Sequence, residues 1–343
     1  MAYEVKILAD SVSPAGHRLT TCMGTFPRLI LAEVNTTRQF GRNSASSRAI
    51  PVAKKIAAVE EDMFIPAAFG RNQKGMQHSE VLSGDEAEAA RARWVALGRA
   101  AIETARELAD MGVHKQYANR VLDPWSWHTA IITATDWDNH EHQRVNPAAM
   151  GEYQVFASML RDARNASAPV QLKPGEWHLP LVERMWMRDT AGGAKDVGEA
   201  YWLTVNGFDP VKVSVARCAR VSGLTHEGKR DPAADVTLYD DTLAAKGHMS
   251  PLEHAARPMD EDELKWTRAY DVSLVNGPTL RTARFRDEPP AVGTSIVLYS
   301  GRKATIARVR GPLHYAGPFN GWISQRQLVH GEEDILGYRG AHG

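Results

Sequence analysis

The feature that most constrains the fold is a long helical pattern near residue 100. From about Asp85 to Met111 the sequence is dominated by alanine and leucine, with charged residues between them. Ser83 and Asp85 are suitable residues for the start of a helix, and Gly112 is suitable just beyond its end. The pattern predicts one uninterrupted helix and a helix-rich protein.

The rest of the chain combines further predicted helices with a few strands. Residues 1–35 favour one or two strands and a first helix, and residues 36–52 are expected to form a polar loop. Further helices are predicted over residues 114–122, 126–143, 147–163, 210–221, 231–246 and 319–328, and a strand over residues 295–299. Residues 258–290 are charged and are expected to be an insertion. The predicted fold class is therefore α+β and helix-rich.

Chain length predicts two lobes or one elaborated domain. The chain has 343 residues, whereas a single hydrophobic core stops growing near roughly 250–300 residues. Residues 167–180 contain several prolines and read as a connection, which divides the chain into residues 1–180 and 181–343.

A short internal sequence similarity suggests that the two parts are related. Ser13-Pro14-Ala15-Gly16-His17 is similar to Ser250-Pro251-Leu252-Glu253-His254. Each segment is followed by a polar tract with an arginine, Arg38 in the first case and Arg326 in the second. We therefore expect two related halves in one chain.

Charge and cysteine content exclude several functional classes. Lys and Arg together number 41, as do Asp and Glu, so the formal net charge is zero. This argues against general binding to a nucleic-acid backbone, which needs clustered positive charge. Cys22 and Cys218 are the only cysteines, which argues against a disulfide scaffold and for a reducing compartment. Without a signal peptide or an apolar membrane span, the chain is expected to be cytoplasmic, with no direct DNA or membrane binding.

The most informative polar segment runs from Thr36 to Arg48. It holds three arginines, Arg38, Arg42 and Arg48, together with Asn43 and several hydroxyl groups. Guanidinium groups can bind a phosphate through paired hydrogen bonds, and an amide can recognise the edge of a base. A solvated surface loop explains the same composition equally well.

A second segment, His248-Met249-Ser250-Pro251-Leu252-Glu253-His254, allows two interpretations. Ser250 and Glu253 have the spacing of a capping box, with Pro251 at the first helical position. Alternatively, a helix N-terminus flanked by His248 and His254 offers hydrogen-bond donors to an anionic or polar cofactor.

Both segments resemble motifs of the flavin-dependent thymidylate synthases, the ThyX-like enzymes. Their arginine motif reads Arg-His-Arg, seven residues and then Ser, and Arg38 and Ser46 keep that spacing. The segment 248–254 resembles their His-x-Ser/Thr-Pro-Phe-Glu-His motif. Arg217-Cys218-Ala219-Arg220-Val221-Ser222 resembles their Arg-Ala-Ala-Arg-Val-Ser stretch, and residues 115–122 resemble a helix beginning Lys-Glu-x-Ala-Arg. The resemblance touches about half of the chain.

The resemblance implies a ThyX-like fold, a homo-oligomer and a role for individual residues. It implies catalytic roles for Arg38, Ser46 and Arg48. It implies FAD binding by Arg38, Asn139, His248, Ser250, Glu253 and Arg326. It implies binding of a dUMP-like pyrimidine deoxynucleotide by Asn43, Ser44, Ser46, Arg48, Arg120 and Arg144. No metal site is implied.

The implied activity is FAD-dependent C5 methylation of dUMP to dTMP, with methylenetetrahydrofolate and NADPH as co-substrates. Two departures keep alternatives open: Thr37 stands where the family has His, and Ser44 where it has Glu. The alternatives are hydroxymethylation or methylation of another pyrimidine nucleotide such as dCMP, and a non-catalytic nucleotide-binding relative. The motif order is also inverted, as expected for a duplicated or permuted chain of the long, phage type, which would act in the host cytoplasm.

Other candidate residues favour structural roles. His140, Glu141 and His142 alternate along the chain, which does not place both imidazoles on one helical face, so an exposed polar patch is expected in place of a metal site. The tryptophans Trp125, Trp127 and Trp137 are expected to pack in a core. Cys218 is expected to be a small packed residue.

Overall fold

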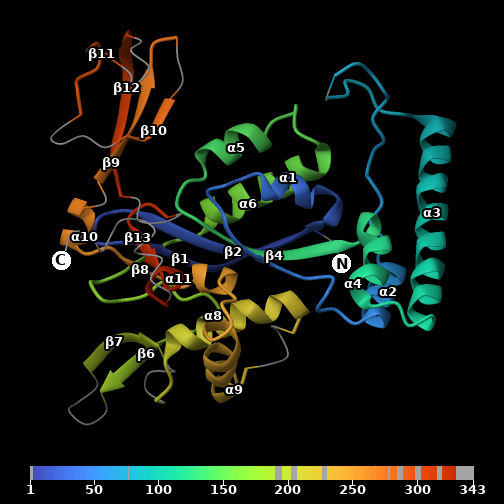
Figure 1. Ribbon diagram of the computed structural model, residues 1–343, viewed down its shortest axis with the longest axis horizontal. Coiled ribbons are helices and arrows are strands. Elements are labelled where there is room, and N and C mark those ends of the chain that lie inside the picture. Colours follow the sequence, from blue (N-terminus) through green and yellow to red (C-terminus); the bar gives the residue numbers. More distant parts are fainter. Residues whose placement is uncertain are drawn as a thin grey trace.

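The computed structural model describes residues 3–75, 77–189, 195–201, 207–225, 230–266, 268–276, 279–283, 289–297, 303–314 and 319–329. A five-stranded sheet with the order β3-β4-β2-β1-β5 lies at its centre (Figure 1). All neighbouring strands in it are antiparallel except β1 and β5. Its strands are β1 (Glu4–Val12), β2 (Arg18–Pro27), β3 (Gly41–Ser44), β4 (Trp127–Ala134) and β5 (Val170–Gln171).

One face of the central sheet is apolar. Cys22 and Phe26 of β2 and Ile132 of β4 point to this face, because side chains alternate along a strand. Helix α6 (Gly151–Ala166) covers it with Phe156 and Leu160, beside α1 (Leu31–Asn35) and α5 (Asp138–Arg144) (Figure 1). These contacts form the largest apolar core.

The opposite face carries hydroxyl groups among its apolar residues. Ile131 of β4 packs there against Cys218 and Val221, at the end of α8 (Pro210–Arg220). Thr21 of β2 lies opposite Thr133 of β4 on the same face. Figure 1 shows α8 on the side of the sheet away from α6. Hydroxyl groups of β2 and β4 therefore lie on the face of the sheet that is away from α6.

Helices α8 and α9 (Pro232–Leu238) begin in the same way. An aspartate precedes each helix, and its carboxylate accepts a hydrogen bond from the second backbone N–H of the helix: Asp209 from Val211, and Asp231 from Ala233. Proline occupies the first helical position in both, where it loses no hydrogen bond. A π-helical turn, η4 (Tyr239–Ala244), continues α9.

The predicted long helix is confirmed as α3 (Gly84–Asp110). It packs through Ile102 and Ala105 on α2 (Val52–Glu61) and on the 3-10 segment η2 (Asn119–Trp125). The remaining helices are α4 (Lys115–Ala118), α10 (Glu261–Trp266) and α11 (Gln325–Val329), and the short 3-10 turns are η1 (Arg28–Ile30), η3 (Val221–Gly223) and η5 (Ser250–Glu253).

Smaller sheets occupy the second half of the chain. A four-stranded sheet has the order β10-β9-β12-β11, and two-stranded sheets pair β13 with β8 and β6 with β7. Their bounds are β6 (Arg184–Asp189), β7 (Lys195–Tyr201), β8 (Ala256–Pro258), β9 (Arg268–Leu274), β10 (Thr279–Ala283), β11 (Ser295–Val297), β12 (Lys303–His314) and β13 (Trp322–Ser324). The order differs from that of the central sheet, so the two related halves and the boundary near residue 180 stay predictions.

Three sequence-based assignments are wrong in part. Residues 127–134 of the predicted helix 126–143 form β4, because β-branched and aromatic residues there pair with β2 and β3. The predicted loop 36–52 contains β3, and the predicted helix 319–328 begins with β13. The predicted strand 295–299 is β11, whose last two predicted residues lie outside the described part of the chain. No described helix has the length and apolar character needed to cross a membrane.

Candidate functional site

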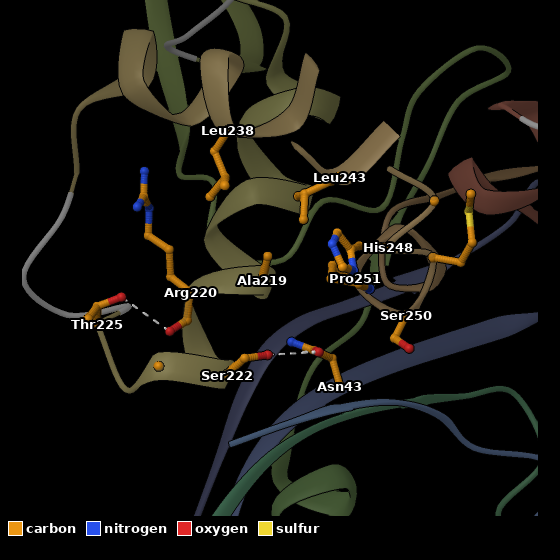
Figure 2. Close-up of a pocket in the computed structure, with 13 residues that line it drawn as sticks. Asn43, Ala219, Arg220, Ser222, Thr225, Leu238, Leu243, His248, Ser250 and Pro251 are labelled. Atoms are coloured by element: carbon orange, nitrogen blue, oxygen red, sulfur yellow. Dashed lines mark hydrogen bonds between the residues drawn. The ribbon is translucent and has the colours of Figure 1, made fainter. Parts of the chain in front are cut away.

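A cavity of about 540 Å³ opens between the edge strand β3, the end of α8 and the turn before η5 (Figure 2). Its volume lies within the range typical of small-molecule sites. It is lined by Asn43, Ala219, Arg220, Ser222, Gly223, Thr225, Leu238, Leu243, Gly247, His248, Met249, Ser250 and Pro251. Three segments singled out in the sequence, around residues 43, 220 and 250, therefore meet at one cavity.

Asn43 joins β3 to the end of α8. Its Nδ2 donates to the backbone carbonyl of Cys218 at 2.7 Å, and its Oδ1 accepts from the hydroxyl of Ser222 at 3.2 Å (Figure 2). Three residues further along the chain, the backbone N–H of Ser46 donates to the carbonyl of Ser222 at 2.9 Å. These bonds attach the end of α8 and the turn after it to β3 and to the segment that follows β3. The cavity wall is thus held rigidly to the sheet.

Two arginines of α8 share one buried carboxylate behind this wall. Asp235 of α9 is fully buried, and its Oδ2 accepts from Arg217 Nε at 3.0 Å while its Oδ1 accepts from Arg220 Nε at 2.8 Å. Two guanidinium groups and one carboxylate leave a net charge of +1 at the cavity. None of the described residues that line the cavity is acidic. Its electrostatics therefore favour an anionic ligand.

The opposite wall is apolar. Leu238 and Leu243 project from α9 and η4, Met249 lies just before η5, and Pro251 lies within it. In Figure 2 the two leucines lie across the cavity from Asn43 and Ser222. A polar, positively charged wall facing an apolar wall suits a ligand with a ring on one side and an anionic group on the other.

The predicted capping box is wrong. Residues 250–253 form a single 3-10 turn, its cap position is Met249, and no side chain caps it. Glu253 instead forms an ion pair with Arg326 at 2.5 Å. Its carboxylate also lies close to Gly41, where an added Cβ would stand 3.2 Å from Oε2. A turn of four residues is too short to form the α-helical hydrogen bonds that a capping box completes.

The residues predicted to bind the nucleotide are only partly brought together. Asn43 lines the cavity, and Ser46 is tied to its wall through Ser222. Arg38 lies exposed in the turn before β3, and Arg48 lies exposed in the turn after it. The hydroxyl of Ser46 accepts from the backbone N–H of Arg48 at 3.3 Å. Neither arginine lines the cavity.

Arg42, between these two arginines, has a structural role. Its guanidinium donates to the carbonyls of Val34, Asn35 and Thr37, which closes the end of α1. Burial lowers the pKa of this guanidinium, and the nearby carboxylate of Glu253 partly offsets that effect.

Four other predicted residues are absent from the cavity lining. Arg120 is exposed and bonds the carbonyl of Gln116. Arg144 stacks over the ring of Tyr153 at 4.9 Å, and Asn139 is exposed on α5. Ser44, on β3, is half-buried and is also absent from the lining.

A buried chain of hydrogen bonds lies on the sheet face opposite α6. It runs from Ser11 to His178 (2.9 Å), from His178 to Thr21 (2.8 Å), from Thr21 to Thr133 (2.7 Å) and from Thr133 to His254 (2.8 Å). Burial lowers the pKa of both His178 and His254 to about 3, so both rings are neutral at pH 7. His254 follows η5, so this chain connects the sheet to the turn beside the cavity.

The described residues of this chain do not assemble a flavin site. Of the residues predicted to bind FAD, only His248 and Ser250 line the cavity. Glu253 and Arg326 pair with each other. Asn139 and Arg38 lie exposed on other elements. The donor set is therefore dispersed, and it does not fit a flavin held by one chain alone.

Residues set aside as structural behave as expected, with two exceptions. One is Trp127, which is half-buried and lines a cavity beside α2, where core packing was predicted. Trp125 and Trp137 are buried in cores, and Cys218 is buried against Ile131, where burial raises the pKa of its thiol. His140, however, is not part of an exposed patch, since it packs among the rings of Phe40, Trp137 and Tyr153. In the described part of the chain, no cluster of three or more His, Cys, Asp or Glu is arranged to hold a metal ion.

Several lining residues carried no signal in the sequence. Leu238 and Leu243 look like ordinary apolar positions of an amphipathic helix, and Thr225 lies in a turn. Ser222 and Arg220 did stand within the stretch that resembles Arg-Ala-Ala-Arg-Val-Ser. That resemblance was the one signal that could have placed them at the site.

Comparisons with known proteins give a limited result. No family model and no curated protein matches the chain. Among solved structures, the fold is similar to a UMP/dUMP methylase PolB from Streptomyces cacaoi bound with 5-Br dUMP, at 14% identity and a TM-score of 0.37 over 47% of this chain and 89% of that chain. The same methylase bound with 5-Br UMP gives 15% identity and a TM-score of 0.40 over 47% and 88% of the two chains. Similarities of this size do not assign a function to this chain.

Proposed function

We propose that the cavity binds a pyrimidine deoxynucleotide such as dUMP, and that the protein methylates this nucleotide at C5 to give dTMP. The observation that carries the proposal is the convergence of Asn43, Ser222 and the segment 248–251 on one cavity of nucleotide size. The resemblance of these segments to the thymidylate synthase motifs supplies the reaction. The proposal does not rest on the similarity to solved structures.

The cavity suggests how a nucleotide is oriented. The pyrimidine ring packs against Leu238, Leu243 and Met249, because these side chains form its apolar wall. Hydroxyl groups of Ser222 and Ser250 are available for hydrogen bonds with polar edges of the ligand. Arg48 and Ser46, in the turn after β3, are proposed to hold the phosphate at the rim.

The proposed use of FAD, methylenetetrahydrofolate and NADPH rests only on the resemblance to the thymidylate synthase motifs. The described residues of this chain that were predicted to bind FAD do not gather at one site. The proposal therefore includes self-association into a homo-oligomer, in which a second copy supplies the missing contacts. The cytoplasmic location is likewise proposed.

Binding is tested by calorimetric titration of the purified full chain with dUMP. Arg48→Ala should weaken binding roughly tenfold or more, as expected for the loss of a charge-assisted hydrogen bond to phosphate. His248→Ala should also weaken binding, whereas His142→Ala, an exposed histidine on α5, serves as the control and should change nothing. Absence of saturable dUMP binding would overturn the proposal.

The reaction is tested separately by release of tritium from [5-³H]dUMP with FAD, a reductant and methylenetetrahydrofolate. Release supports dTMP synthesis. Release from labelled dCMP but not from dUMP supports methylation or hydroxymethylation of that other nucleotide.

A non-catalytic nucleotide-binding protein is the second candidate. The dispersed flavin residues favour it, as does Thr37 in place of the motif histidine. Saturable nucleotide binding with no tritium release from any pyrimidine nucleotide, in a protein that is not yellow, is the result expected for this candidate.

A further inference from the structure

A second, smaller cavity is lined in part by the segment that follows β3. It has a volume of about 80 Å³ and lies between α2, the start of β4 and Leu224. Ala45 and Ser47 line it, whereas Asn43 lines the larger cavity, so the two cavities share one segment of chain. This volume holds a few water molecules or one small anionic group, and it is too small for a nucleotide.

The small cavity is positively charged. Arg28, Lys54 and Lys55 line it, and none of its lining residues in the described part of the chain is acidic. Arg28 is paired with Asp123, at 2.7 Å between Nε and Oδ1. Lys55 is buried, with 6% of its surface exposed, and the charges of Arg28 and Asp123 act on its ammonium in opposite directions. Desolvation lowers the pKa of Lys55 to about 8, which leaves most of it charged at pH 7.

Three buried side-chain donors at the same cavity, on Trp127, His128 and Ser47, are without partners among the described residues, the first being Nε1 of Trp127. The ring of His128 is 2% exposed, and its Nδ1 lies 2.9 Å from Arg28 Nη1. A guanidinium can only donate, so Nδ1 accepts and the neutral ring carries its proton on Nε2, which has no partner. The hydroxyl of Ser47, 4% exposed, has no partner either. A buried donor without an acceptor is costly, so these groups point to a missing acceptor.

Hydrogen bonds to the backbone hold the segment around Ser47 in place without any ligand. The side chain of Asn119, which is fully buried, donates to the backbone carbonyls of Ser47 and Ile50 at 2.8 and 2.9 Å. The backbone N–H of Ala45 bonds the carbonyl of Thr129. The donors are therefore held in place by the fold, as a binding site requires.

We propose that this cavity is a binding site for a small oxyanion of the phosphate class, held by the Lys55 ammonium, the Ser47 hydroxyl and the Nε2–H of His128. An oxyanion supplies several acceptor lone pairs and a negative charge, which matches three donors and a surplus of positive charge. The inference does not depend on the nucleotide proposed for the larger cavity.

The site is tested with inorganic phosphate and the purified full chain, by following the melting temperature at constant ionic strength as phosphate replaces chloride. A saturable rise is expected, because a ligand that binds only the folded state stabilises it. Ser47→Ala should weaken phosphate binding roughly tenfold, since it removes one donor to a charged group. Lys74→Met, at an exposed lysine in a loop, is the matched control for Lys55→Met.

Lys55→Met has a signature that a structural lysine would not show. Without phosphate, the variant should melt at a higher temperature than the parent chain, because an uncompensated buried charge has been removed. With phosphate, it should gain no stability. A rise that is equal in the parent, Ser47→Ala and Lys55→Met chains, or no rise relative to chloride, would overturn the proposal.

A competition experiment identifies the source of the anion. Phosphate protection that disappears when dUMP is saturating assigns the site to the phosphoryl group of a nucleotide that reaches across from the larger cavity. Protection that persists assigns it to a free oxyanion. Both results support the site, and failure of dUMP to bind leaves the phosphate measurement intact.

Discussion

Asn43 combines a structural role with a place in the cavity wall. Both ends of its amide are hydrogen-bonded, to Cys218 and to Ser222, and only 7% of its surface is exposed. An amide held in this way is oriented before any ligand arrives. Recognition of a base by Asn43 would therefore use the remaining donor and acceptor positions of an immobile group.

Asn43→Ala should lower the free energy of unfolding by about 1–2 kcal/mol, because two partly buried hydrogen bonds are lost. Chemical denaturation measures the change. Ser44→Ala, at the half-buried neighbour on β3, is the control and should cost less than about 0.5 kcal/mol. Loss of nucleotide affinity with unchanged stability would show that Asn43 contacts the ligand without holding the wall.

Asp235 offers a sharper test, since one carboxylate serves both Arg217 and Arg220. Asp235→Asn should destabilise the fold by about 3–5 kcal/mol, because two buried guanidinium groups lose their counter-charge. The control is Asp240→Asn, which removes an exposed pair with Lys212 and should cost less than about 1 kcal/mol. Equal losses in the two variants would contradict the buried-triad interpretation.

At the scale of elements, sequence patterns predicted helices better than strands. The helices α3, α6, α8 and α9 were found because alanine-rich composition, aspartate caps and Pro210 or Pro232 mark them locally. Strand β4 was mistaken for a helix because a short, continuous apolar run is compatible with either structure until its partners are known. Its partners, β2 and β3, lie about a hundred residues away in the chain.

In the candidate site, too, residues marked by a local sequence pattern were predicted and residues that depend on long-range packing were not. The motif residues Asn43, His248 and Ser250 were predicted, because their spacing resembles a known family, and they do line the cavity. Leu238 and Leu243 could not be predicted, since an apolar residue facing a cavity looks identical in sequence to one facing the core. The wall that they form depends on how α9 and η4 pack against α8, which is a long-range property.

The contact between β2 and α6 depends on a small residue. At Gly24, an added Cβ would stand 2.6 Å from a ring carbon of Phe156, which is fully buried. Gly24→Ala should therefore destabilise the protein by about 1–3 kcal/mol through overpacking, measured by chemical denaturation. Gly151→Ala, at the start of α6 with open space around it, is the control and should be neutral or slightly stabilising. A neutral Gly24→Ala would show that this core can rearrange at little cost.

For the whole molecule, buried histidines set the response to acid. Burial lowers the pKa of His128, His178 and His254 to about 3 and that of His140 to about 4, against 6.5 for an exposed ring. The unfolded chain therefore binds more protons than the folded chain between these values. Stability should be complete above about pH 6.5 and should fall as the pH decreases through this window, by about 2 kcal/mol per histidine at pH 5.

Melting temperatures measured from pH 7.5 down to pH 4.5 check this expectation. His140→Phe should both stabilise the protein and flatten the curve, because it removes a ring whose two nitrogens have no partner among the described residues. His142→Ala, at an exposed position, should leave the curve unchanged. A melting temperature that does not vary over this range would show that the four rings are not held neutral by the fold.

The buried chain from Ser11 to His254 has a consequence for tautomers. Its hydrogen bonds join five neutral side chains, each with one proton to donate. When every bond is directed the same way, both imidazoles carry the proton on Nε2, or both carry it on Nδ1. The five side chains make four hydrogen bonds with one another, so one donor is left unused in this chain of bonds. In one direction the unused donor is the Nε2–H of His254, beside the η5 turn, and in the other it is the hydroxyl of Ser11 on β1. The two rings therefore change tautomer together, although they contact different parts of the sheet, and the change requires no movement of the backbone.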